Sequence, residues 1–297
     1  MQEVFGVSER RACRVLGQSR TTQQRPYPAA TEEETALIGR MRELAQQHPR
    51  YGYRRIWALL VAEGWHVNRK RIYRLWKQAG LKVRNWPRKQ PRPGGGENAC
   101  HVRRPEYPNH VWSYDITTDQ TVDGRGLKFL VVLDEFTRRC LALEVGRSMT
   151  SHRVVSVLEE LVRIHGAPGG MRSDNGPEFV AKRVKDWLEN GGIETLYIEP
   201  GSPWQNGYIE SFNSRLEDEF LSQQSFRGTE EAEVLAEHYR LEYNHVRPHS
   251  ALEYQTPVRF ATEWRPASVA SAPAALQPSY TPSNEGNDNR VLETALP

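Results

Sequence analysis

Cysteine is scarce in this chain, and long apolar runs are missing from it. Cys13, Cys100 and Cys140 are the only cysteines among 297 residues, and they lie far apart without C-x-x-C spacing. Neither a zinc site nor a disulfide framework is therefore indicated. No stretch approaches the ~20 apolar residues of a membrane helix, and the start, MQEVFGVSERRACRVLG, has no apolar core of a secretory signal. These absences favour a soluble protein of a reducing cytoplasm.

The charge of the chain is divided unevenly along its length. The net charge is only +3, but residues 1–104 carry a balance of +14 (22 basic, 8 acidic) and the remainder −11 (18 basic, 29 acidic). A basic front beside an acidic body indicates a polyanion that is contacted mainly from the N-terminal third. The alternative is an ordinary solvated surface.

The basic third has the layout of a helix-turn-helix domain. Thr31 and Glu34 have capping-box spacing at the start of one helix, a second helix covers 54–64, and a third begins after Asn68 and stops at Gly80. This order predicts contact with DNA through the third helix; the alternative is a small bundle with a solvated basic face. The candidate DNA-binding cations are Arg54, Arg55, Arg69, Lys70, Arg71, Arg74 and Lys77.

Composition divides the chain into five parts. We expect an N-terminal helical segment and connector (1–30), a helix-turn-helix domain (31–81), a Pro-, Gly- and Arg-rich basic linker (82–104), a body (105–262) and a disordered tail rich in Ala, Pro and Ser (263–297). In the body, alternating patterns predict strands at 110–121, 126–136 and 139–146 in an antiparallel meander. A helix at 151–166 follows, with Val154, Val157, Leu158, Leu161 and Ile164 inward. Later strands alternate with helices, which indicates an α/β layer with a partly parallel sheet.

Three carboxylates occupy unusual places in this body. Asp115 lies within a strand in WSYDITTD, Asp174 follows a strand in MRSDNGPEF, and Glu210 lies at the margin of a helical apolar stripe. A cation would relieve the repulsion and lost hydration of such groups, and hard oxygen ligands select Mg²⁺ or Mn²⁺. Taken singly, the three could equally be a strand-edge charge, a turn residue and a surface acid.

Four motifs of the body resemble the Asp–Asp–Glu core of bacterial insertion-sequence transposases and retroviral integrases: WSYDIT, SDNGPEF, GSPWQNGYIESFNSRL and YNHVRPHSALEYQTP. As in that family, 35 residues separate the last two acids. The resemblance implies an RNase H-like fold, a mixed five-stranded sheet with flanking helices. It implies Asp115, Asp174 and Glu210 as catalytic residues and metal ligands, with two Mg²⁺ or Mn²⁺ ions for each site. It also implies DNA contacts from a loop with Gln205 and Asn206, and from Asn213 and Arg215.

The leading hypothesis is a transposase, a polynucleotidyl transferase that cleaves and joins DNA at the terminal repeats of its element and at a target. We expect a homo-multimer on DNA in the bacterial cytoplasm, near the nucleoid and away from membranes, with an upstream reading-frame product as a further partner. Two alternatives are a DNA-binding regulator without catalysis and a metal-dependent nuclease without strand transfer. The complete acidic triad argues against the first alternative, since a pure binder has no need of it.

Overall fold

The computed structural model describes residues 2–25, 31–81, 83, 103–173, 176, 181–198 and 206–266. The predicted tail after residue 266 and most of the predicted linker lie outside these ranges. At the N-terminus, α2 (Glu9–Val15) matches the expected short helix. It is preceded by α1 (Gln2–Phe5) and followed by α3 (Arg20–Gln24), which falls where we expected a connector. Among the described residues, no helix is long and apolar enough to cross a membrane.

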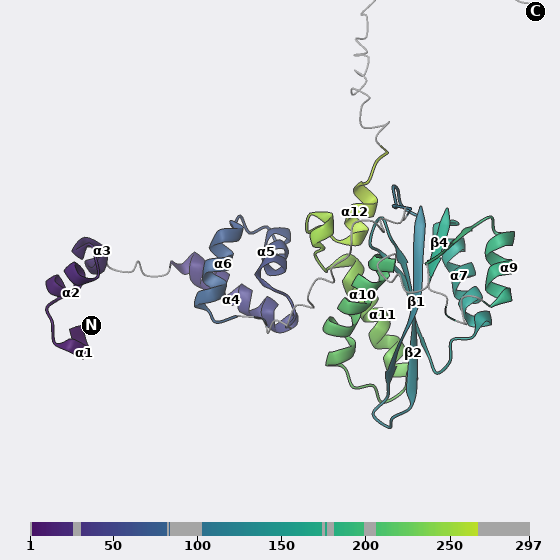
Figure 1. Cartoon of the computed structure of the whole chain (residues 1–297), viewed down its shortest axis with the longest axis horizontal. Coiled ribbons are helices and arrows are strands. Elements are labelled where there is room, and N and C mark those ends of the chain that lie inside the picture. Colours follow the sequence, from purple (N-terminus) through teal and green to yellow (C-terminus); the bar gives the residue numbers. More distant parts are fainter. Residues whose placement is uncertain are drawn as a thin grey trace, which may run out of the picture.

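Three helices, α4 (Glu32–Gln47), α5 (Tyr53–Ala62) and α6 (Arg69–Gln78), form the helix-turn-helix unit (Figure 1). The caps expected from the sequence are present: the Thr31 side chain accepts from the Glu34 N–H, and Asn68 Oδ1 accepts from the Lys70 N–H at 2.8 Å. Gly80 has a positive φ of 70° just after the last helix, a backbone conformation that glycine adopts without strain. Buried apolar side chains join the three helices into one small core.

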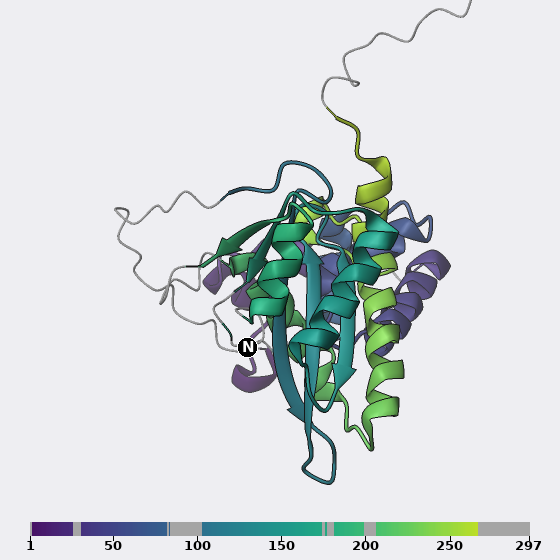
Figure 2. The ribbon, with the colours of Figure 1, turned by 90° about the vertical axis from the view of Figure 1, so that its right-hand side faces the viewer.

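The body is built on a five-stranded mixed sheet in the order β3-β2-β1-β4-β5. The predicted meander is confirmed, because β1 (Val111–Gln120) pairs antiparallel with β2 (Gly126–Asp134), and β2 pairs antiparallel with β3 (Cys140–Gly146). On its other side, β1 pairs parallel with β4 (Gly170–Ser173), which pairs parallel with β5 (Glu194–Tyr197). Strand β1 is therefore the middle strand, and it connects the antiparallel and parallel halves (Figure 2).

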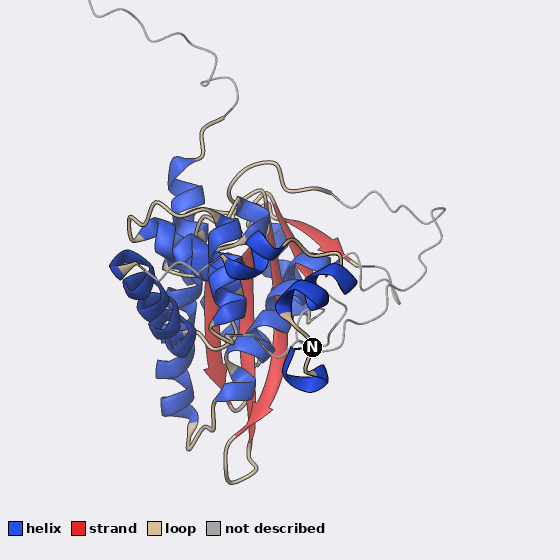
Figure 3. Cartoon of the chain, turned by 90° about the vertical axis from the view of Figure 1, so that its left-hand side faces the viewer, coloured by secondary structure: helices blue, strands red, loops and turns tan. Residues whose placement is uncertain are grey.

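Helices cover both faces of this sheet (Figures 1 and 3). One core packs the odd-numbered β2 residues from Leu127 to Leu133 against α10 (Gly207–Glu219) and α11 (Thr229–His245). The other packs Leu130 and Val132 against α7 (Ser151–His165) and α9 (Lys182–Asn190). The strand period of two thus supplies both layers from one strand. The chain continues through η2 (Leu221–Gln223), η3 (Ser250–Leu252) and α12 (Pro257–Glu263).

The expected inward face of α7 needs one correction. Val154, Leu158 and Leu161 are buried as predicted, but Ile164 is 56% exposed. Successive helical residues are 100° apart, so Ile164 lies 60° from Leu161 and 120° from Leu158, beyond the edge of the buried face. The sequence spacing predicted that Ile164 is buried. It is exposed because the contact between α7 and the sheet is too narrow to cover it.

Candidate active site

Asp115 is held in the middle strand by hydrogen bonds to both of its carboxylate oxygens. The Ile116 N–H donates to Oδ1 at 2.8 Å, and Asn213 Nδ2 donates to Oδ2 at 2.6 Å. The side chain is half-buried. Each of these bonds occupies one acceptor position of a different oxygen. The carboxylate is thus held in a fixed orientation by its surroundings.

Glu210 lies on the first turn of α10, three residues before Asn213. Residues three apart on a helix share one face, so the Asn213–Asp115 hydrogen bond turns the Glu210 face of α10 toward β1. Ile209, Phe212 and Leu216 are buried against the sheet, while Glu210 itself is exposed. The expected turn of Glu210 toward the sheet stays a prediction, since its side chain is exposed. What the structure shows is that Asn213, one helical turn after Glu210, brings α10 against Asp115 of β1.

The third predicted acid, Asp174, lies outside the described residues, as does Gln205. The described stretch before Asp174 ends at Ser173 on β4, which pairs parallel with β1. Among all the described residues, no group of three His, Cys, Asp or Glu side chains is arranged for a metal ion. The structure therefore describes two of the three predicted carboxylates, Asp115 and Glu210.

A buried ion pair lies just before the position of Asp174, and sequence reasoning missed it. Arg172 on β4 contacts Glu135 at 2.8 Å (Nε to Oε1), with side chains only 5% and 0% exposed. Ser113 on β1 also donates to Glu135, and Arg172 Nη2 donates to the Arg103 carbonyl at 2.8 Å. Burial raises the pKa of Glu135, and the charge of Arg172 opposes that rise. The sequence could have indicated this pair, because an arginine inside a short apolar strand needs a buried acidic partner.

The predicted DNA-binding residues fall into different environments. Arg54, Arg69, Lys70, Arg74, Lys77 and Arg215 are exposed. Arg55 pairs with Glu219 on α10 at 2.7 Å, so its charge is already neutralised in part. Asn206, directly before α10, is buried, and Asn213 bonds Asp115 rather than pointing freely to solvent. The third helix thus carries four of the exposed cations, Arg69, Lys70, Arg74 and Lys77, whereas Asn213 of α10 contacts a carboxylate.

Matches to three family models cover most of the chain. The model described as an HTH-like domain matches residues 32–90, and the models described as an integrase core domain match residues 105–203 and 191–257. These matches coincide with the helix-turn-helix unit and with the sheet and its flanking helices.

Relatives from insertion elements agree with these matches. The chain is 40% identical over 278 residues to the uncharacterized 31.7 kDa protein of insertion element IS407 from Burkholderia multivorans, covering 93% of this chain and 98% of that protein. It is 28% identical over 239 residues to the transposase InsD of an IS2 element from Escherichia coli, covering 76% and 78%. The HTLV-2 integrase catalytic core in complex with magnesium aligns with a TM-score of 0.44 at 17% identity, covering 53% of this chain and 99% of that one. The chain belongs to the insertion-sequence transposase family with an integrase core domain, and its enzyme class is that of a DNA transposase, a polynucleotidyl transferase.

Proposed function

We propose that this transposase cleaves and joins DNA at the ends of an insertion sequence by metal-dependent transesterification, with Asp115, Asp174 and Glu210 as its catalytic carboxylates. The observation that carries the proposal is the Asn213–Asp115 hydrogen bond, which aligns the Glu210 face of α10 with the middle strand. The register of the parallel pair adds support. It pairs Ser113 with Arg172, and in the sequence each of these residues stands two positions before a predicted catalytic aspartate.

The donor set fits a hard divalent cation. Carboxylate oxygens are the ligands that Mg²⁺ and Mn²⁺ prefer, and the Asp115 carboxylate is oriented by Asn213 in the way that supporting residues orient metal ligands. Asn213 Oδ1 is buried and has no hydrogen-bond partner among the described residues, so it could accept from water at the site. We propose that Asp115, Asp174 and Glu210 hold two such ions.

The proposed reaction has two in-line steps. Water first attacks a phosphodiester at the element end, so that one P–O bond forms to the water oxygen while another breaks, which leaves a 5′-phosphate and a 3′-hydroxyl. That hydroxyl then attacks a target phosphodiester, forming one P–O bond while another breaks. When bound, the ions would lower the pKa of the attacking hydroxyl and stabilise the leaving oxygen. No protein nucleophile is required, and both cysteines that the structure describes, Cys13 and Cys140, are buried free thiols.

The reaction is tested with a labelled duplex copied from the DNA that flanks the coding sequence. With Mg²⁺ or Mn²⁺ the protein should nick this duplex and then join it to a second one, and EDTA should stop both steps. Nicked product without joined product would instead favour a nuclease. Unchanged activity in EDTA would contradict the metal assignment.

We further propose that α6 docks on duplex DNA as a multimer of this chain brings two element ends together near the bacterial chromosome. Arg69, Lys70, Arg74 and Lys77 are exposed on this helix. Clustered cations neutralise phosphates and release counterions, which makes binding strongly dependent on salt. An upstream reading-frame product is proposed as a further partner, because such a segment could add a second DNA-binding element.

Replacing both Arg74 and Lys77 by alanine should weaken duplex binding and lower the slope of log affinity against log salt by about 2, since each phosphate contact contributes about 0.9. Arg71→Ala is the matched comparison, because its guanidinium already contacts Glu33 at 3.1 Å and Glu34 at 3.6 Å. We expect that change to alter the slope less. Fluorescence anisotropy across a salt series measures both, and an unchanged slope in the double variant would reject α6 as the docking helix.

A further inference from the structure

The helix-turn-helix unit contacts the catalytic body at the far end of α10. Arg50, in the turn between α4 and α5, pairs with Asp218, and Arg55 on α5 pairs with Glu219 at 2.7 Å (Nη1 to Oε1). Both carboxylates lie on the last turn of α10, the helix whose first turn carries Glu210. One helix therefore connects a catalytic candidate to the domain that we expect to bind DNA.

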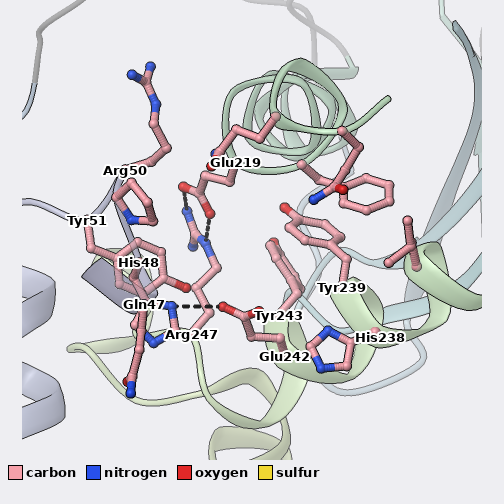
Figure 4. A pocket seen from close by; sticks show the side chains of 15 residues that line it. Gln47, His48, Arg50, Tyr51, Glu219, His238, Tyr239, Glu242, Tyr243 and Arg247 are labelled. Carbon is pink, nitrogen blue, oxygen red and sulfur yellow. Dashed lines mark hydrogen bonds and ion pairs between the residues drawn. The ribbon is translucent and has the colours of Figure 1, made fainter. Parts of the chain in front are cut away.

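Glu219 is the centre of this contact. Besides Arg55, it accepts two hydrogen bonds from Arg247, at 2.6 Å and 2.8 Å, and the Glu219 and Arg247 side chains are each only 5% exposed. Burial would raise the pKa of Glu219, but the hydrogen bonds and charges of Arg247 and Arg55 outweigh it and lower the pKa. The carboxylate is thus ionised at neutral pH and bridges one arginine of each domain. Figure 4 shows it with Arg247 in the cleft where the domains meet.

Two further contacts widen the interface. His48, just after α4, lies 3.0 Å from Glu242 of α11 (Nδ1 to Oε1). Figure 4 labels both side chains in the cleft. The Trp57 ring on α5 meets the Tyr254 ring edge-on, with centroids 5.9 Å apart. Arg55 also lies over the ring of buried Tyr51, at 5.0 Å. Single exposed ion pairs contribute little to stability. This interface also includes the buried carboxylate of Glu219, the ring contact of Trp57 with Tyr254 and the Arg55 guanidinium over Tyr51.

The docked side of the helix-turn-helix unit is not its proposed DNA-binding side. The contacts with the body come from residues 48–57, in the α4–α5 turn and on α5. Lys70, Arg74 and Lys77 on α6 stay exposed in the same structure. A duplex could therefore be bound by α6 while the unit remains docked on the body.

Helix α10 is a short and direct connection between the two sites. Glu219 follows Glu210 by nine residues, which is about 14 Å along the axis at ~1.5 Å for each residue. We propose that Asp218 and Glu219 are positioning residues, which fix the helix-turn-helix domain on the catalytic helix and so hold the bound duplex at a set place relative to Glu210. The docking stands by itself, whereas its effect on catalysis rests on the proposed function.

Docking is tested by reversing one ion pair and then restoring it. Spin labels are placed at Gln46→Cys on α4 and Val234→Cys on α11, both exposed, in a full-length chain whose three native cysteines are changed to alanine and whose fold is checked by circular dichroism. We expect a narrow label-to-label distance distribution in this chain. Arg50→Asp or Asp218→Arg should broaden it, and the double swap should narrow it again.

Two more variants make the docking test decisive. Arg42→Asp changes an exposed arginine of α4 outside the interface and should leave the distribution narrow. Arg55→Glu places a second carboxylate beside Glu219 and should broaden it more than Arg50→Asp does. Narrow distributions in both Arg50→Asp and Arg55→Glu would overturn the proposed docking.

The effect on catalysis is measured with the same variants without labels. At saturating duplex we expect cleavage to fall about tenfold or more in Arg50→Asp and Asp218→Arg, because small misplacements of a reactant are costly, and to recover in the double swap. Duplex affinity should change less than about twofold, since α6 is intact. Undocked variants that cleave at the normal rate would overturn the positioning role. A parent chain that never cleaves would instead contradict the proposed function, and the distance measurement would still decide the docking.

Discussion

Replacing Glu210 by glutamine should abolish cleavage and strand transfer while DNA binding stays unchanged. The amide keeps the size of the side chain but removes the charge that would hold a cation. We expect a loss of about 10³-fold or more, equivalent to about 4 kcal/mol of transition-state stabilisation. Single-turnover cleavage of the element-end duplex in Mg²⁺ measures the loss, and anisotropy on the same duplex measures binding.

Glu217→Gln is the matched control for this experiment. Glu217 is an exposed acid seven residues later, two turns along the same face of α10. It should keep normal activity, so a general effect of helix charge is separated from loss of the site. If Glu210→Gln were as active as Glu217→Gln, Glu210 would not be a catalytic residue.

Asp115→Asn and Asp174→Asn belong to the same prediction and should be as inactive as Glu210→Gln. Residues that act as one unit show strongly non-additive effects, so a chain with two of these changes should be hardly worse than a chain with one. If the activity losses of the single variants multiplied in the double variant, the three carboxylates would act at separate places.

Replacing Glu135 by alanine should destabilise the body by about 3–5 kcal/mol, because it leaves the buried guanidinium of Arg172 without its counter-charge. Arg172 is 4% exposed and lies on β4, next to the middle strand. Urea unfolding of the whole chain, followed by circular dichroism, measures the change in the free energy of unfolding.

Two further variants separate the buried charge from simple loss of a side chain. Glu144→Ala removes a glutamate of β3 whose partner Arg153 is 3.7 Å away and partly exposed, so it should cost less than about 1 kcal/mol. Changing Glu135 and Arg172 together to methionine should be less harmful than Glu135→Ala, since no unpaired charge remains. A double variant as unstable as Glu135→Ala would show that the unpaired charge is not the cause.

Local patterns predicted most of the fold because they depend on neighbours in sequence. The caps at Thr31 and Asn68 follow from side chains that reach backbone N–H groups two or three residues away. The meander of β1 to β3 follows from alternation and short turns. Ile164 is the exception, because the extent of a helix's buried face depends on what lies opposite it.

By itself the sequence determined the helix-turn-helix unit and a partly parallel sheet, since the spacing of charged and apolar residues expresses both, and it predicted the candidate carboxylates through the resemblance to Asp–Asp–Glu cores. Only the tertiary structure decided that Asn213 bonds Asp115, that Arg172 pairs with Glu135, and that Arg55 contacts Glu219. These contacts join residues separated by 98, 37 and 164 positions. No local period encodes which distant side chain will meet a buried charge. That is settled only when the layers pack, because each buried polar group must then find its partners among the side chains within hydrogen-bond reach.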